Sequence, residues 1–251
     1  MTILITGATS GFGEATAKLF AKNGYNLIIT GRRKDRLEKI SQQLSTSYKI
    51  KVLTLNFDVR KKKEVDTAID SLKDEWKHID ILINNAGLAS GLSTIQEGDI
   101  EDWEKMIDTN IKGLLYMTRK VAPLMIKQGN GHIINIGSVA GKEVYANGNV
   151  YCATKHAVDA LNKAMRIDLL PHGLKVTAIN PGLVETEFSI VRFHGDAERA
   201  KKVYQGFKPL TAEDIAETIY WTATRPAHVN INDIIITPTA QANSTNVIRK
   251  Q

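Results

Sequence analysis

A tyrosine and a lysine four residues apart, Tyr151 and Lys155, are well suited to proton chemistry. They lie in a segment whose small and apolar residues recur at helical spacing, so both side chains leave the same face of a predicted helix. A neighbouring ammonium stabilises a phenolate and lowers the pKa of tyrosine from about 10 towards neutrality, which suits a general acid or base. An exposed pair without a function has the same spacing, so other residues must decide between the two interpretations.

Two further polar residues occupy positions that favour chemistry. The apolar run 133–136 predicts a strand, and Ser138 follows it at the edge of the sheet where ligands bind in open α/β folds. A hydroxyl placed there can donate to a substrate carbonyl. Asn110 falls on the apolar side of its predicted helix, where an amide must find partners. A satisfied core asparagine and a relay that holds a water molecule are both consistent with this position.

The first apolar run leads into Thr6-Gly7-Ala8-Thr9-Ser10-Gly11-Phe12-Gly13, which is followed by a helical pattern. A strand, a glycine turn and a helix start bring bare backbone N–H groups and the positive end of a helix to one point, which favours pyrophosphate binding. The spacing differs from the commoner G-x-G-x-x-G pattern. A purely structural turn also needs glycine, so the loop alone does not establish a nucleotide site.

The second apolar run is followed by Gly31-Arg32-Arg33, where folds specific for NAD carry an acidic residue. Arg32 and Arg33 instead offer charge-assisted contacts to a 2′-phosphate, so the sequence favours NADP over NAD. The alternative is that both arginines only solvate the start of the next helix.

The elements that position these residues follow from short runs rich in Ile, Val and Leu. Runs without polar alternation are typical of strands covered on both faces, and segments with helical spacing separate them. We therefore predict an α/β fold with one doubly wound parallel sheet of about seven strands. The strands are expected at residues 3–5, 27–29, 52–57, 79–83, 133–136, 176–179 and 234–236.

The length of 251 residues fits a single domain spanning 1–251, without a linker or repeat. The least regular stretch, 181–208, is predicted to form a mobile substrate lid. It contains Arg192, which we expect to contribute to binding a substrate carboxylate, although an arginine on a solvated lid surface fits equally well.

Composition narrows the function classes. The 33 basic and 27 acidic residues are interspersed, so the net charge of +6 does not by itself predict nucleic-acid binding, and no basic patch interleaved with aromatic residues is present. The single cysteine suits a reducing compartment. The sequence begins without a signal-peptide pattern and has no membrane-spanning apolar stretch, so we expect a cytoplasmic protein without membrane partners.

Together, the motifs resemble those of the short-chain dehydrogenase/reductase family over nearly the whole chain. They occur in the family's order: Thr6-Gly-x3-Gly-x-Gly13, Asp58-Val59, Asn84-Asn85-Ala86-Gly87, Asn110, Ser138, Tyr151-x3-Lys155 and Pro181-Gly182 with Thr186. The resemblance implies a Rossmann fold, with Tyr151 as general acid/base and Ser138 orienting the carbonyl. It also implies that Lys155 grips the nicotinamide ribose and that Asn110 holds a relay water.

The same resemblance assigns residues to the ligands. Asp58-Val59 is placed at the adenine, Asn85 at the adenosine side and 181–189 at the nicotinamide end. The implied substrate contacts are Ser138, Tyr151 and Arg192, and no metal is expected. The implied NADP-binding residues are Gly7, Thr9, Ser10, Gly11, Phe12, Gly13, Arg32, Arg33, Asp58, Val59, Asn85, Ala86, Gly87, Tyr151, Lys155, Pro181, Gly182, Val184 and Thr186.

A closer likeness is to the bacterial NADP-dependent 3-hydroxy acid dehydrogenases that act on serine and L-allo-threonine, which are typically tetramers. It is carried by the segments 101–110, 131–138, 191–196 and 226–232. Asn147 stands where glycine is expected, which leaves the shape of the substrate wall open. The resemblance therefore predicts a homotetramer that oxidises small 3-hydroxy acids, including 3-hydroxyisobutyrate.

Three alternatives remain open. The same scaffold suits a 3-oxoacyl carrier-protein reductase or a broad carbonyl reductase. A non-catalytic NADP-binding regulatory protein would usually lack the tyrosine or the lysine, and both are present here. A nucleic-acid binder is the alternative that the sequence supports least.

Overall fold

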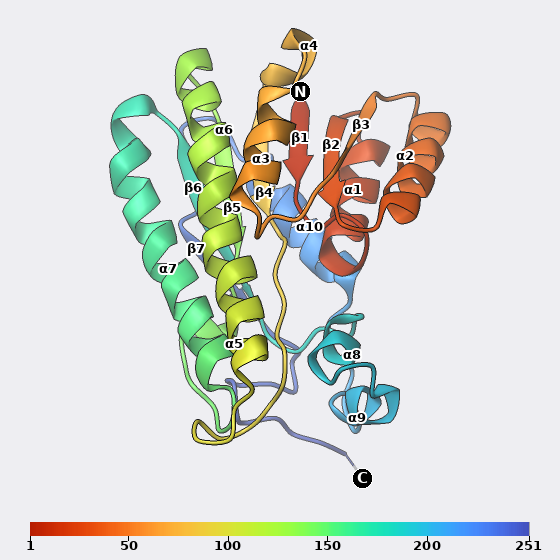
Figure 1. The fold of residues 1–251 in the computed structure, drawn as a ribbon, viewed down its shortest axis with the longest axis vertical. Coiled ribbons are helices and arrows are strands. Elements are labelled where there is room, and N and C mark those ends of the chain that lie inside the picture. The colour runs from red at the N-terminus through yellow and green to blue at the C-terminus, as the bar shows by residue number, and fades with distance from the viewer. Residues whose placement is uncertain (251) are drawn as a thin grey trace.

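The computed structural model describes residues 1–250, which form one parallel α/β sheet with helices on both faces (Figure 1). Within those residues, seven strands lie in the order β3-β2-β1-β4-β5-β6-β7, and every neighbouring pair is parallel. The predicted doubly wound fold is confirmed. The strands are β1 (Thr2–Ile5), β2 (Asn26–Gly31), β3 (Val52–Asn56), β4 (Ile81–Asn84), β5 (His132–Ile136), β6 (Lys175–Pro181) and β7 (Asp233–Ile236).

The central strands are mainly apolar because both faces of the sheet are covered there, as in β1 and β4. In β1, Leu4 packs into the core beneath the helices α3, α6 and α7, whereas Ile3 and Ile5 pack beneath α1, α2 and α10. Successive side chains of a strand point to opposite faces, so a strand buried on both sides cannot alternate with polar residues. These helices are α1 (Gly11–Lys22), α2 (Lys34–Tyr48), α3 (Lys62–Asp70), α6 (Leu114–Gln128), α7 (Asn149–Leu169) and α10 (Ala212–Ala223).

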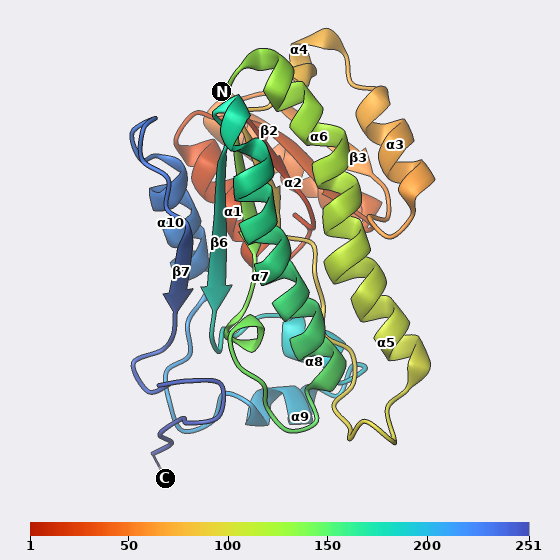
Figure 2. The ribbon, with the colours of Figure 1, turned by 90° about the vertical axis from the view of Figure 1, so that its left-hand side faces the viewer.

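The remaining helices are short or irregular. A π-helix separates α5 from α6, and α8 and α9 lie beyond the carboxyl ends of β6 and β7 (Figure 2). These segments are α4 (Asp74–Lys77), α5 (Ile100–Ile107), the π-helix η1 (Asp108–Gly113), the 3-10 turns η2 (Val139–Gly141) and η3 (Leu170–His172), α8 (Phe188–Arg192) and α9 (Ala197–Lys202).

The strand order reverses between β1 and β4, which places the loops after these two strands on either side of one crevice. Ligands of open α/β sheets bind at such a switch point, outside the carboxyl ends of the strands. The glycine loop follows β1, and Asn84-Asn85-Ala86-Gly87 spans the end of β4. The fold therefore brings two of the predicted motifs to the same edge.

The predicted lid differs from the expectation of an irregular stretch. Pro181 is still the last residue of β6, and the segment then contains α8 and α9. Asp196 caps α9 by accepting a hydrogen bond from the Arg199 N–H at 2.9 Å. Helices of five and six residues are too short to show an apolar period, so the sequence pattern did not reveal them.

Candidate active site

A pocket of about 370 Å³ opens at the carboxyl ends of the strands. Its volume lies in the range typical of small-molecule and cofactor sites. All the residues that the sequence assigned to catalysis, cofactor or substrate line this pocket, apart from Gly13 and Asn110. The structure thus brings together side chains and backbone groups from segments up to about 180 residues apart.

The glycine loop is shaped by close backbone packing. Gly7 and Gly11 have φ angles of +67° and +52°, which side chains rarely adopt. A Cβ at Gly13 would collide with the carbonyl oxygen of Gly7, so Gly13 serves packing and does not face the pocket. The amide of Asn85 donates to the carbonyl of Thr6 at 2.7 Å, which fastens the end of β4 to this loop. The loop is therefore a preformed backbone cradle at the start of α1, of the kind that binds pyrophosphate.

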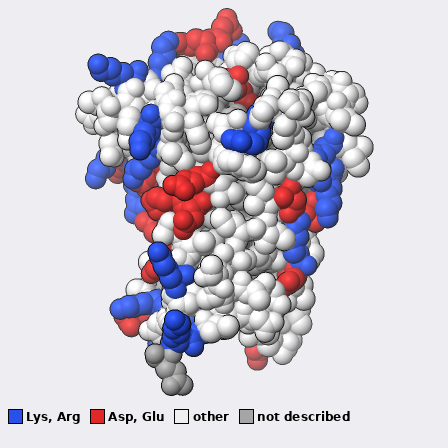
Figure 3. Space-filling view, turned by 180° about the vertical axis from the view of Figure 1, so that it is seen from behind, with Lys and Arg blue, Asp and Glu red and all other residues white. Residues whose placement is uncertain are grey.

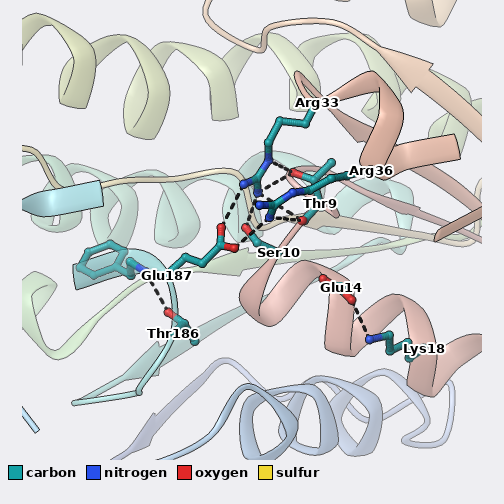
Figure 4. A network of polar contacts seen from close by, with 9 residues as sticks. Thr9, Ser10, Glu14, Lys18, Arg33, Arg36, Thr186 and Glu187 are labelled. Atoms are coloured by element: carbon teal, nitrogen blue, oxygen red, sulfur yellow. Dashed lines mark hydrogen bonds and ion pairs between the residues drawn. The ribbon is translucent and has the colours of Figure 1, made fainter. Parts of the chain in front are cut away.

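Arg33 follows β2 beside this cradle and is held on three sides (Figure 4). Its guanidinium donates to the hydroxyl of Thr9 at 3.0 Å and to that of Ser10 at 2.7 Å. Its NH1 group contacts a carboxylate oxygen of Glu187 at 2.9 Å, and Arg36 contacts the other oxygen at 2.8 Å. The hydrogen bonds from Arg36 and Arg33 lower the pKa of Glu187. Glu187, from the predicted lid, therefore bridges two arginines beside the cofactor cradle.

Arg32 is less constrained than Arg33. Its side chain is 59% exposed, and its nearest carboxylate is that of Asp58, at 4.0 Å. Asp58 is engaged instead by Arg60, which donates to it at 2.6 Å. Burial raises the pKa of Asp58, but the hydrogen bonds from Arg60 outweigh this effect and the pKa is lowered. Arg32 is thus the more available of the two arginines for a phosphate group.

The opposite end of the pocket is buried. Tyr151 and Lys155, on α7, are 8% and 6% exposed, and Ser138 follows β5 and caps η2 through the N–H of Ala140. The ammonium of Lys155 donates to the carbonyl of Ile136 at 2.9 Å and lies 5.9 Å from the centre of the Tyr151 ring. The predicted tyrosine, lysine and serine therefore share one buried site.

Burial dominates the protonation of this pair. It raises the pKa of Tyr151 well above its ordinary range, and the nearby Ser138 hydroxyl opposes the increase. It lowers the pKa of Lys155 to about 8. The expectation that Lys155 depresses the pKa of Tyr151 is thus not met in the chain alone. The physical reason is that removing water penalises both charged forms, and the ammonium is directed at the Ile136 carbonyl.

Asn110 lies behind the pocket, on the π-helix η1. Its side-chain oxygen accepts from the Leu88 N–H at 2.9 Å, and its amide donates to the Leu88 carbonyl at 2.8 Å and to the Thr154 hydroxyl at 3.0 Å. A π-turn widens a helix by one residue, which brings this side chain to the strand-end loop that contains Gly87 and Leu88. The side-chain oxygen and amide of Asn110 both form hydrogen bonds with protein groups. Its role in holding a relay water remains a prediction.

Arg192, at the end of α8, reaches the buried end of the pocket. The centre of its guanidinium lies 5.4 Å from the centre of the Tyr145 ring and 5.7 Å from that of Tyr151. Its Nε donates to the carbonyl of Gly91 at 3.3 Å. Its NH2 group is buried without a hydrogen-bond partner among residues 1–250. The sequence left Arg192 open as a surface residue, whereas the structure places it against the tyrosine.

Several residues of the site were missed by sequence reasoning. Glu187 was covered only by the assignment of 181–189 to the nicotinamide end, whereas the structure pairs it with Arg33 and Arg36. Arg36 is a charged residue in a surface-like context, and Tyr145 precedes the tyrosine motif without a distinguishing pattern. His194 and Asp102 contact each other at 3.0 Å although 92 positions separate them. The sequence suggested the basic residues of the lid, His194 among them, as partners of a substrate carboxylate, but it did not predict the contact of His194 with Asp102.

The comparisons with known proteins agree with this geometry. The family described as short chain dehydrogenase matches residues 1–196, so the chain belongs to that family. It is 50% identical over 243 residues to a protein of Salmonella typhi named NADP-dependent 3-hydroxy acid dehydrogenase YdfG, covering 96% of each chain. It is 46% identical over 241 residues to sulfoacetaldehyde reductase 2 of Chromohalobacter salexigens, covering 96% of this chain and 95% of that protein.

Among solved structures, the chain is similar to the closed form of a serine dehydrogenase complexed with NADP+. The TM-score is 0.94 at 46% identity, with each chain covered completely.

Proposed function

We propose that this short-chain dehydrogenase uses NADP to transfer a hydride between nicotinamide and the 3-hydroxyl carbon of small 3-hydroxy acids, such as serine, L-allo-threonine and 3-hydroxyisobutyrate. The observation that carries the proposal is the position of Arg192. A guanidinium with a buried, unpartnered nitrogen, as judged over residues 1–250, faces the ring of Tyr151. Such a group suits a substrate whose carboxylate lies close to the reacting alcohol. The names of the relatives support the same substrate class.

The residues present fit an NADP molecule. The cradle between Gly7 and Gly11 suits a pyrophosphate, and Arg32 and Arg33 supply positive charge at one end of the pocket. Lys155 stands at the other end, where we assign it the nicotinamide ribose. The bound cofactor supplies the hydride chemistry, and the chain supplies position and electrostatics.

The proposed roles of the chain's own groups follow from burial. Tyr151 transfers the proton of the substrate hydroxyl, and Ser138 orients the substrate oxygen by hydrogen bonding. Because water is excluded from this buried end of the pocket, each of these hydrogen bonds is stronger than it would be in water. We assign Asn110 a positioning role, because it holds the strand-end loop beside Gly87 and Lys155.

The test is NADPH absorbance during incubation with NADP and a panel containing serine, 3-hydroxyisobutyrate and 3-hydroxypropionate, repeated with NAD. We expect NADP to be reduced faster than NAD. An acetoacetyl thioester with NADPH tests the carrier-protein reductase alternative, and turnover of the thioester alone would overturn the proposal. Arg192→Ala is expected to raise the KM for serine and 3-hydroxypropionate about tenfold or more, and an unchanged KM would contradict the assignment.

We also propose how the chain is organised, where it is located and how it assembles. We assign a single domain to 1–251, a moving lid to 181–208, a cytoplasmic location and a homotetrameric assembly, which light scattering tests directly. None of the helices in residues 1–250 combines the length and the apolar composition that a membrane span requires. The face seen in Figure 3 carries basic and acidic side chains together, which does not favour a nucleic-acid surface there.

A further inference from the structure

Beside the substrate end of the pocket lies Asp102, a buried carboxylate that contacts three side chains and has no role in the proposed chemistry. Asp102 lies on α5 and is 4% exposed. Its Oδ1 accepts from the hydroxyl of Ser90 at 2.6 Å, and its Oδ2 accepts from Nε2 of His194 at 3.0 Å. The ammonium of Lys105 stands 3.6 Å from Oδ1. A buried carboxylate therefore joins the loop after β4 to the segment that follows α8.

Each of these two segments is attached to Arg192, one by hydrogen bonds and the other by the chain itself. The N–H of Gly91 donates to the Arg192 carbonyl at 2.9 Å, and the Gly91 carbonyl accepts from Nε of Arg192. Gly91 follows Ser90 and has a φ angle of +70°, and a Cβ there would lie 2.7 Å from Oδ2 of Asp102. His194 is two residues beyond Arg192. Asp102 thus anchors both the peptide that Arg192 contacts and the chain that bears Arg192.

His194 adopts a backbone conformation that needs support. Its φ angle is +54°, a region that residues other than glycine rarely occupy. Its side chain is 59% exposed, so core packing does not explain the conformation. The hydrogen bond to Asp102 is the contact that directs this ring inwards.

We infer that the His194–Asp102 pair is a positioning device that sets the guanidinium of Arg192 over Tyr151 and so determines selectivity for acidic substrates. This inference rests on the proposed function and adds two residues to it. Neither residue touches the reacting atoms. Without the pair, Arg192 keeps its charge, but its segment is attached to the loop after β4 only through Gly91 and no longer through His194.

The experiment compares 3-hydroxypropionate with 3-hydroxypropionamide, which has the same size but lacks the carboxylate. His194→Ala removes the donor, whereas His194→Gln retains an N–H that can reach Asp102, and both share the same backbone constraint. We expect His194→Ala to raise the KM for the acid about tenfold, with kcat and the KM for the amide within about twofold of the parent. His194→Gln is expected to restore most of the loss. His172→Ala, at an exposed histidine far from the pocket, is the matched control.

A double-mutant comparison separates positioning from a general effect on the lid. If His194 acts through Arg192, the variant Arg192→Ala/His194→Ala has the same KM for the acid as Arg192→Ala alone. Additive losses, or equal losses for acid and amide, would overturn the inference. If the parent does not oxidise 3-hydroxypropionate at all, the proposed function itself fails. A parent that oxidises it and a His194→Ala variant with parental KM refute only the positioning role.

Asp102→Leu provides a second route to the same answer. It keeps the approximate size of the side chain and removes both oxygens, which accept from Ser90 and His194. We expect the same selective rise in KM for the acid, measured alongside NADPH affinity by fluorescence to show that the cofactor end is intact. A parental acid-to-amide ratio in a folded Asp102→Leu protein would contradict the inference.

Discussion

The two ends of the pocket are built on opposite principles. At one end, Tyr151 and Lys155 are almost fully buried, and burial shifts the pKa of each in the direction that favours the neutral form. At the other end, the side chains of Arg32 and Arg33 are 59% and 41% exposed, and they pair with carboxylates in contact with water. Buried polar contacts are costly to lose, whereas exposed ion pairs contribute little each. Substitutions should therefore have large effects at one end and graded effects at the other.

The largest effect at the buried end is expected from Tyr151→Phe. Phenylalanine keeps the packing against Phe188, whose ring centre lies 5.7 Å away, and removes only the hydroxyl. We expect kcat to fall about 10³-fold, because the general acid/base is lost, with NADPH affinity within twofold of the parent. Stopped-flow NADPH absorbance and fluorescence titration measure the two quantities. Parental turnover in a variant that binds NADPH normally would refute the proton-transfer role.

Lys155→Met should separate activity from stability. Burial lowers the pKa of Lys155 from an ordinary 10.5 to about 8, so below pH 8 the folded chain carries a cation that burial penalises by about 3 kcal/mol. Methionine removes this penalty and sacrifices the charge-assisted hydrogen bond to the Ile136 carbonyl, worth about 2 kcal/mol. At pH 7 we expect the variant to be inactive yet more stable to urea by about 1 kcal/mol.

The sign of that stability difference depends on pH. Between pH 8 and 10.5 the unfolded chain holds the Lys155 proton and the folded chain does not, so the parent regains stability as pH rises. The advantage of Lys155→Met should therefore disappear by about pH 10. Lys201→Met, at an exposed lysine of α9, is the control and should show no such crossover. A variant that is less stable than the parent at pH 7 would contradict the argument.

The same contrast explains which parts of the fold and of the site could be predicted from the sequence. The central strands were predictable because burial on both faces leaves apolar runs without alternation, as in β1 and β4, and the partly exposed edge strands β3 and β7 keep short apolar runs as well. Ser138, Tyr151 and Lys155 were predictable because each belongs to a short local motif. The contacts of Glu187 with Arg33 and of His194 with Asp102 join segments 154 and 92 positions apart, and no local pattern encodes them.

Backbone irregularities were equally hidden. The π-helix η1 adds one residue to a helical turn without a change in composition, so the segment around Asn110 reads as an ordinary helix. The 191–196 stretch gives no sign that His194 adopts a positive φ. Tertiary contacts impose both features, and only a structure reveals them.

At the exposed end, Arg32 and Arg33 should differ. Arg32 has few contacts, so Arg32→Ala is expected to raise the KM for NADP about tenfold and leave that for NAD unchanged. Arg33 also ties the glycine loop to Glu187, so Arg33→Ala should weaken both cofactors. The ratio of kcat/KM for NADP to that for NAD, measured at low and high salt, distinguishes them. Equal effects of the two substitutions would show that both arginines serve only the 2′-phosphate.

The smallest expected effect belongs to Glu187→Gln. The carboxylate engages one NH group of Arg33 and one of Arg36, and a 2′-phosphate would compete with it for the same donors. Because exposed ion pairs are weak, we expect the KM for NADP to fall only about two- to fivefold, with NAD unaffected. Glu185→Gln, at an exposed neighbour, is the matched control. An increase in the KM for NADP would mean that Glu187 holds the arginines in place for the phosphate, and the exposed end would then be as preorganised as the buried one.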